Sequence, residues 1–321
     1  MKSPDVNDFA PESVLITDGG PARRIMKCVT PVANGRDGKF RAADSASFLT
    51  SNRLSINISV SSGCVGKCAL VCPSGLPNTF QGPMFNADEM VRQVDAHLRL
   101  RGDRCNGRMI DVGTFADGDA GSNEDAVLEA AQVVLLRDDR IDHIGVSTIG
   151  VRANTFFPKF IKTAQRFKPG RCRFHYSYYG PDAHDGLIPP PAPPIDAVFE
   201  DLAGVGRQSG FPVTLNIPMI AGYTDTDGNM QRTAEQVSKY SNAFRVKLST
   251  FNTDGSDGGS NALQPSSLES IVACAQYLRA QGLLVKIFFA DIQDDGTHVE
   301  AGCGRLNIKT RHTTLNALEN K

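Results

Sequence analysis

Three cysteines, Cys64, Cys68 and Cys72, lie within nine residues of one short, glycine-containing loop. The loop follows an alternating apolar segment, 54–60, that is typical of a β-strand. Three thiolates on such a loop can bind one face of an iron–sulfur cluster and leave one iron open for a further ligand. If the strand belongs to a parallel barrel, the loop lies at the carboxyl edge, where barrel enzymes have their active sites.

Two other interpretations of these cysteines stay open. A structural zinc site is the first, but such sites prefer close C-x2-C pairs and a nearby fourth ligand. The spacing here is C-x3-C-x3-C, and no fourth ligand lies close in the sequence. The second is a group of buried cysteines on a turn, which Gly63, Gly66 and Lys67 make unfavourable because they do not suit an apolar core.

The composition predicts one large soluble domain. The chain has 321 residues, is 40% hydrophobic and carries a formal net charge of −1. That length suffices for a single α/β barrel core, and the charge balance predicts no broad basic surface for nucleic acid. We expect a cytoplasmic protein without membrane association, because the N-terminus has no apolar signal region and no apolar run reaches about 18 residues. The clustered cysteines favour a metal or redox site in a reducing compartment over a disulfide framework.

The rest of the chain alternates between predicted strands and helices, which indicates parallel βαβ units. Strands are predicted at 12–17, 24–30, 54–60, 108–115, 143–148, 171–178, 213–219, 243–251 and 283–289. Helices are predicted after the capping residue Asn86, at 123–136, 156–167, 195–208 and 229–241, and from a capping box at 266–269 to residue 281. Residues 31–52 are polar and are interpreted as a loop or insertion. We therefore predict an α/β fold, a partial (β/α)6-type TIM barrel at 54–321, preceded by a short N-terminal β-hairpin extension at 1–53.

Small polar residues follow several of these strands. Gly118 and Asp119 follow the second barrel strand, and a Ser-Thr pair that begins at Ser147 ends the third. A Ser-Tyr-Tyr run, 177–179, ends the fourth strand, and Asn252 follows the sixth. Each could be an ordinary turn or cap, but together they predict a polar ligand over the carboxyl edge of the barrel.

These residues resemble those of radical S-adenosylmethionine (SAM) enzymes, and more narrowly the RlmN/Cfr-type methylases, which methylate an RNA adenine. The resemblance covers roughly 54–306. It rests on Val-Ser-Ser before the cysteines, Val-Ser-Thr at 146–148, the segment 213–225, Phe251-Asn252 and the ending EAGCGRL at 300–306. The last is the most specific, because in that family its cysteine accepts a methyl group from one SAM and carries it to the substrate.

The resemblance implies a role for each candidate residue. Cys64, Cys68 and Cys72 would bind a [4Fe–4S] cluster whose open iron binds SAM, and an electron donor of flavodoxin or ferredoxin type would reduce it. Cys303 would carry the methyl group. Gly118 and Asp119 would contact the SAM amino group, although the family usually has glutamate at the acidic position. The residues that would contact the rest of SAM are Ser147, Ser177, Tyr178, Tyr179 and Asn252.

The chain departs from the family pattern at two places. The family's cluster motif is C-x3-C-x2-C, so Val71 stands where the third ligand is expected and Cys72 follows it. The family's second reactive cysteine, which releases the product through a disulfide with the methyl carrier, aligns directly with Ser59. Our hypothesis is that 31–58 is an insertion and that Cys28 is this resolving cysteine. Glu12, at the family's spacing before it, is then a candidate proton acceptor.

The substrate class follows from a further departure. RNA-modifying members of the family have a substantial RNA-binding domain before the cluster motif, whereas 63 residues precede Cys64 here. A small-molecule substrate, methylated at an sp² carbon, is therefore favoured over RNA. The alternatives are an RNA adenine methylase, a radical SAM enzyme without methyl transfer, and a non-catalytic metal-binding protein.

Overall fold

The structure, a computed structural model, describes residues 16–19, 23–32, 41–49, 52–61, 63–64, 84–188, 192–240, 242–251 and 263–288. Its main feature is a ten-stranded sheet whose strands lie in chain order from β1 to β10. The strands are β1 (Ile16–Gly19), β2 (Arg23–Val32), β3 (Arg41–Leu49), β4 (Arg53–Asn57), β5 (Met109–Gly113), β6 (Ile141–Thr148), β7 (Cys172–Ser177), β8 (Val213–Met219), β9 (Phe244–Thr250) and β10 (Val285–Phe288).

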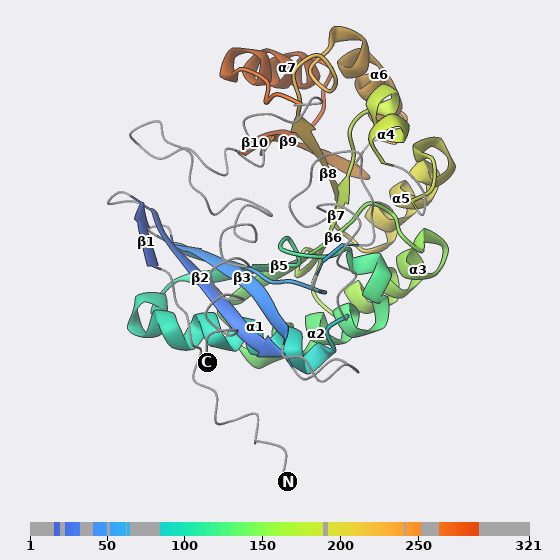
Figure 1. The fold of residues 1–321 in the computed structure, drawn as a ribbon. Coiled ribbons are helices and arrows are strands. Elements are labelled where there is room, and N and C mark those ends of the chain that lie inside the picture. Colours follow the sequence, from blue (N-terminus) through green and yellow to red (C-terminus); the bar gives the residue numbers. More distant parts are fainter. Residues whose placement is uncertain are drawn as a thin grey trace.

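The sheet has an antiparallel part and a parallel part. Strands β1 to β4 pair antiparallel. Strands β4 to β10 pair parallel throughout. The sheet curls without closing, and β1 and β10 are its two edges (Figure 1). The predicted partial barrel with an antiparallel N-terminal extension is thus confirmed.

Helices connect the parallel strands and cover the outer, convex side of the sheet (Figure 1). The α-helices are α1 (Ala87–Arg101), α2 (Glu124–Arg137), α3 (Ala153–Ala164), α4 (Pro181–Leu187), α5 (Ile195–Gln208), α6 (Asp227–Ser238) and α7 (Leu268–Ala280). Short 3₁₀ helices, η3 (Gly102–Cys105) and η4 (Ala120–Asn123), precede β5 and α2. The core lies between this helical layer and the sheet and includes Ile56, Val112, Phe174 and Leu215. None of the described helices is long and apolar enough to cross a membrane.

Local sequence signals determine where the helices begin. Asn86 accepts a hydrogen bond from the Glu89 amide at 2.9 Å, and the Glu89 carboxylate accepts one from the Asn86 amide at 2.8 Å. This reciprocal pair is the capping box predicted for α1. At α7 the predicted cap is wrong by one residue, because the Ser267 hydroxyl, rather than that of Ser266, accepts from a backbone amide, that of Ser270.

The segment 31–52 is also predicted wrongly, since residues 41–49 of it form strand β3 rather than a loop. β3 pairs with β2 over nine residues and with β4 over four. Its Ser45 hydroxyl lies 3.0 Å from His97 Nε2, and its Ser47 hydroxyl accepts from Arg101 at 3.1 Å. Both partners belong to α1, so contacts with α1 fix this strand. The short helix α4 was not predicted either.

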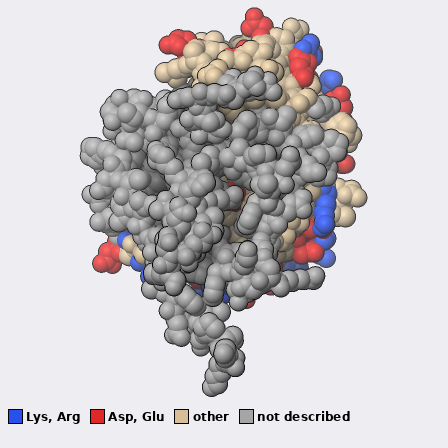
Figure 2. Space-filling view, in the orientation of Figure 1, with Lys and Arg blue, Asp and Glu red and all other residues tan. Residues whose placement is uncertain are grey.

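Figure 2, in the same orientation, shows Lys, Arg, Asp and Glu side chains along the margin of the molecule, with both signs interspersed. This distribution agrees with the near-zero net charge. The visible margin therefore has no large patch of a single sign.

Candidate functional site

The cysteine loop begins where β4 reaches the carboxyl edge of the parallel strands. Backbone hydrogen bonds from Ile58 to Gly113 and from Val60 to Asp117, each 2.8 Å, keep this segment beside β5 up to the loop. Cys64 follows and is half-buried. Its position is therefore the edge of the barrel at which the sequence predicts the site.

Gly118 packs directly against the beginning of the cysteine loop. Its φ is +94°, in the region that favours glycine, and a Cβ there would lie 2.6 Å from a Val60 methyl group and would overlap Ser61 Oγ. The Ser61 hydroxyl in turn donates to the Gly63 carbonyl at 2.5 Å, one residue before Cys64. The two segments predicted to act together, 118–119 and the cysteine loop, are therefore in contact.

Asp119 lies beside Gly118, and its carboxylate accepts hydrogen bonds from other groups of the protein. Oδ1 accepts from the Gly121 amide at 2.9 Å and from the Thr148 hydroxyl at 2.8 Å, and Oδ2 accepts from the Ile149 amide at 2.7 Å. A carboxylate offers about four acceptor positions, so one is left for a ligand. The predicted contact with the SAM amino group stays a prediction, and Asp119 also joins the loop after β5 to the end of β6.

Replacing Asp119 should destabilise the fold. Asp119→Ala leaves the buried amides of Gly121 and Ile149 without their acceptor. We expect the free energy of unfolding to fall by about 3 kcal/mol, since an orphaned buried donor costs about 1–3 kcal/mol. Urea denaturation measures this loss. The control Asp139→Ala, in an exposed turn, should change stability by less than about 0.5 kcal/mol. Equal effects of the two variants would show that the Asp119 hydrogen bonds contribute nothing.

Burial raises the pKa of Asp119 to about 6, although its hydrogen bonds with Ile149, Thr148 and Gly121 lower it. The unfolded chain releases this proton near pH 4. Between about pH 4 and pH 6 the unfolded state therefore loses its proton while the folded state retains it. The contribution of Asp119 to the free energy of unfolding therefore falls as the pH rises. The difference in unfolding free energy between wild type and Asp119→Ala should shrink over this window. A difference that grows would mean that the hydrogen bonds outweigh burial.

Two of the predicted SAM-contacting serines lie on the concave face of the sheet. Ser147 pairs with His175 and Ser177 pairs with Asn216, and residues paired across strands share a face. The Thr114 hydroxyl accepts from the Ser147 amide at 3.0 Å and fixes the end of β6. Asn216 Oδ1 is buried and has no hydrogen-bond partner among the described residues. This part of the concave face presents small polar groups suited to a polar ligand.

The two predicted tyrosines lie elsewhere. Tyr178 is fully buried, packs against Phe199 of α5 and donates its hydroxyl to Gln236 of α6 at 2.6 Å. Tyr179 belongs to a separate buried cluster, and its carbonyl accepts from Asn229 at 3.0 Å. The Tyr178 side chain therefore belongs to the core on the helical side. A contact between Tyr178 and SAM stays a prediction, and such a contact would involve the backbone of Tyr178 rather than its side chain.

Five predicted residues lie outside the described residues: Glu12, Cys68, Cys72, Asn252 and Cys303. Cys28 is on β2, where its backbone pairs with Ser45 of β3. The proposed insertion 31–58 contains two strands of the sheet, β3 and β4, and β4 is the strand that pairs with β5 and leads into the cysteine loop.

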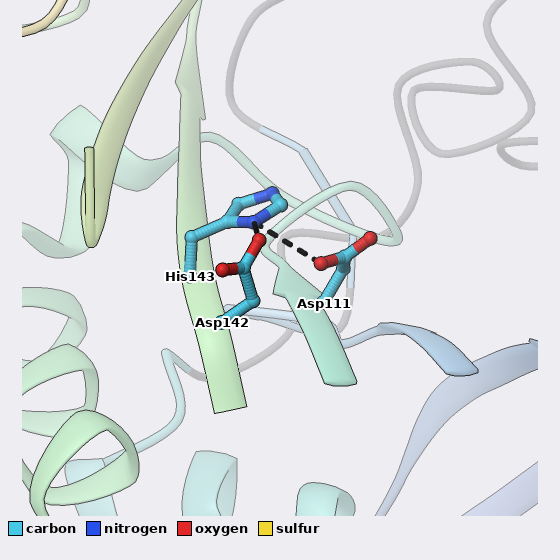
Figure 3. A group of neighbouring side chains, drawn as sticks. All are labelled: Asp111, Asp142 and His143. Carbon is cyan, nitrogen blue, oxygen red and sulfur yellow. Dashed lines mark hydrogen bonds and ion pairs between the residues drawn. The ribbon is translucent and has the colours of Figure 1, made fainter. Parts of the chain in front are cut away.

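A second group of polar side chains lies on the concave face nearer the amino ends of the strands. Figure 3 shows Asp111 of β5 with Asp142 and His143 of β6, and His143 Nδ1 lies 3.1 Å from both carboxylates. Three such groups could bind a metal ion. However, Arg53 Nη1 lies 2.6 Å from Asp111 and 3.2 Å from Asp142. Arg173 also lies 3.5 Å from Asp142. Because these two guanidinium groups neutralise the two carboxylates, the group is an ion-pair network.

Other polar residues of this concave face were not predicted from the sequence, such as Arg173, His175, Arg245 and Lys247. A signal was present, because apolar and polar residues alternate along β7 and along the first five residues of β9. In a sheet covered by helices on one side, that alternation indicates a second face that is not apolar.

Comparison with known proteins gives structural matches. No protein-family model matches the chain, and no match is found among curated proteins. A crystal structure of a radical SAM methyltransferase from Sphaerobacter thermophilus matches with a TM-score of 0.71 and 22% identity, over 92% of this chain and 80% of that one. A spore photoproduct lyase variant with bound AdoMet and dinucleoside spore photoproduct matches with a TM-score of 0.52 and 11% identity, over 73% of this chain and 76% of that one. The chain therefore has the fold of radical SAM enzymes.

Proposed function

We propose that this protein is a radical SAM enzyme, a C-methyltransferase acting on a small molecule. The observation that carries the proposal is the packing of Gly118 against Val60 and Ser61, where the loop that contains Cys64 begins, at the carboxyl edge of a sheet with the radical SAM fold. The fold match to a radical SAM methyltransferase supports the reaction class. The net charge is small, and charged side chains of both signs alternate along the margin of the molecule in Figure 2. Both features favour a small-molecule substrate over RNA.

The residues at this edge fit the proposed cofactors. Cys64 would bind a [4Fe–4S] cluster together with Cys68 and Cys72. When bound, the cluster and SAM supply one-electron chemistry that generates a carbon-centred radical. Gly118 allows the loop after β5 to approach the cysteine loop without a Cβ overlap. Ser147, Ser177 and the buried oxygen of Asn216 offer hydrogen bonds to a polar ligand on the concave face.

The remaining roles are proposals from the family resemblance. Cys303 would attack the methyl group of one SAM as a thiolate, and its glycine neighbours at 302 and 304 allow close approach. Cys28 would then form a disulfide with Cys303 as the product leaves, and Glu12 would accept the substrate proton. Asn252 would bind SAM beyond the end of β9. A flavodoxin- or ferredoxin-type protein would supply the electron.

Electron paramagnetic resonance of the reconstituted protein tests the proposal. The protein is loaded anaerobically with iron and sulfide, reduced, and measured with and without SAM. We expect a [4Fe–4S]⁺ signal that shifts when SAM is added, because an open iron binds the methionine part of SAM. S-adenosylhomocysteine, which keeps the amino acid part of SAM but has no sulfonium methyl group, should also shift the signal but should not methylate Cys303.

Other outcomes favour the alternatives. A cluster signal indifferent to SAM, or tightly bound zinc in place of iron, would favour a metal-binding protein without catalysis. A SAM-dependent signal with no methylated Cys303 in the purified protein would favour a radical SAM enzyme without methyl transfer. The altered spacing C-x3-C-x3-C makes this measurement decisive, since Cys72 stands one residue later than the family's third ligand.

A further inference from the structure

One side of the concave face carries an excess of positive charge. Arg173 and His175 of β7 and Arg245 and Lys247 of β9 alternate with core residues, so they face the interior of the curl. We call these four residues the basic wall. Across β4 to β10 the cations of this face are Arg53, Arg173, Arg245, Lys247 and Lys286, whereas the carboxylates are Asp111 and Asp142.

The two carboxylates do not neutralise the basic wall. Asp111 and Asp142 both pair with Arg53, and His143 lies against both. Arg173 pairs with Asp142 at 3.5 Å, donates to the Gly170 carbonyl at 2.8 Å and lies 3.2 Å from His143 Nε2. The two carboxylates are therefore matched by Arg53 and Arg173, and the excess of positive charge among the described residues of this face lies on β9 and β10.

Within the basic wall, Arg173 and Arg245 share one aromatic ring. Their guanidinium carbons lie 4.9 and 4.7 Å from the centroid of Phe211. Burial and the charge of Arg173 lower the pKa of Arg245 to about 10. The described polar contact of Arg245 is a neutral one, a hydrogen bond to the Thr214 hydroxyl at 2.6 Å. Two like charges held this close repel each other, and an anion between them would remove the repulsion.

His175 is the residue at the centre of the basic wall. Its Nε2 is buried and has no hydrogen-bond partner among the described residues, and its ring meets Phe115 edge-on at 4.8 Å. Burial, followed by the charges of Lys247, Arg245, His143 and Arg173, lowers its pKa well below 6.5. The imidazole is therefore neutral, and a neutral imidazole can donate from Nε2 to a bound oxyanion. A buried polar atom in a native fold normally has a partner, so this one indicates a ligand.

We propose that the basic wall binds an oxyanion, a phosphate or carboxylate group, of the small-molecule substrate. This inference rests on the proposed function for its location. His175 pairs directly with Ser147, and Lys247 pairs with Asn216, which is paired with Ser177. An anion at the basic wall therefore lies next to the residues assigned to SAM. The rest of the substrate would extend from there toward the carboxyl edge, where Cys64 is.

Anion titration of the full-length protein tests the proposal. Inorganic phosphate and malonate are the two probes, and they distinguish a phosphate from a carboxylate group. Isothermal titration calorimetry should show binding of one or both to the wild type. The dissociation constant should rise about tenfold or more in Lys247→Gln, since this variant loses a charged hydrogen-bond donor to the anion. The control Lys162→Gln, which removes an equal charge from the exposed side of α3, should leave the dissociation constant unchanged.

A second measurement reports on the wall itself. The ¹⁵N signal of His175 should shift when phosphate or malonate is added, whereas that of the buried His97 on α1 should not. Reductive cleavage of SAM by the wild type, measured without any anion present, reports on the proposed function alone, so failure of the proposed function and failure of the basic wall are distinguishable.

Four results would overturn the inference. The first is that neither anion binds the wild type, and the second is that the anion binds the wild type and Lys247→Gln with equal affinity. The third is that SAM displaces the anion one for one. The fourth is that a single-stranded RNA oligonucleotide binds more tightly than either anion, and that this binding depends on Lys247. The third would assign the wall to the SAM carboxylate, and the fourth would assign it to a nucleic acid.

Discussion

Cys64→Ala should lose the iron–sulfur cluster and all reductive cleavage of SAM. Cys64 is the first residue of the cysteine loop and the one that the structure places against the Ser61–Gly63 turn at the carboxyl edge of β4. A cluster bound by three thiolates retains only two when one is removed, and two do not hold a cubane in place. Iron and sulfide analysis, visible absorbance and 5′-deoxyadenosine formation measure the loss.

The matched control for this prediction is Cys274→Ala. Cys274 is a buried cysteine of α7 whose thiol donates to the Asp225 carbonyl at 3.8 Å. This variant should lose some stability, by about 1 kcal/mol, and keep its cluster and SAM cleavage. Full iron content in Cys64→Ala would contradict the ligand assignment. In that case another thiol, or the zinc alternative, would have to explain the loop.

The parts of the fold predicted from the sequence are those that local patterns determine. The capping box of Asn86 and Glu89 involves residues three apart, so the sequence alone contains it. The bounds of α5 and β8 match the prediction because their apolar residues recur at a helical and a strand period, respectively. The alternation of these elements was enough to predict a partial barrel.

The parts that were missed depend on distant residues. β3 has few β-branched residues and is a strand because β2 and β4 flank it and Arg101 of α1 bonds to Ser47. The cap of α7 is Ser267 rather than Ser266 because the Ser266 amide donates to the carbonyl of Met219, the last residue of β8, at 3.0 Å. Neither interaction leaves a local trace in the sequence.

In the candidate site, too, local sequence predicts some features, whereas others depend on distant residues. Asp119 was selected for its type and its position after a strand, and its location beside the cysteine loop follows from the topology of parallel strands. Its bonds to Thr148 and Ile149 link positions about thirty residues apart, so its internal role could be found only in three dimensions. The basic wall likewise requires β7 and β9 to curl around a common interior.

The second large effect concerns Cys303. Cys303→Ala should still bind the cluster and cleave SAM, because the loop at Cys64 is unchanged. Methylated product should fall at least about a thousandfold, since removal of a covalent nucleophile typically costs several orders of magnitude. Mass spectrometry should find a methylated Cys303 in the wild type and none in the variant. Product formation at the wild-type rate would remove the methyl-carrier role.

Cys28→Ala separates the two thiols of this scheme. If Cys28 resolves the intermediate, its removal leaves the methylated substrate bound to Cys303, and a covalent adduct should accumulate with at most one turnover. Ser59→Ala is the informative companion, because Ser59 occupies the family's position by direct alignment. Its hydroxyl accepts from the Asp117 amide at 3.0 Å and is buried, so this variant should lose stability without trapping an adduct. Unchanged turnover in Cys28→Ala, with no adduct, would remove Cys28 from the reaction and leave the resolving group to be sought elsewhere in the chain.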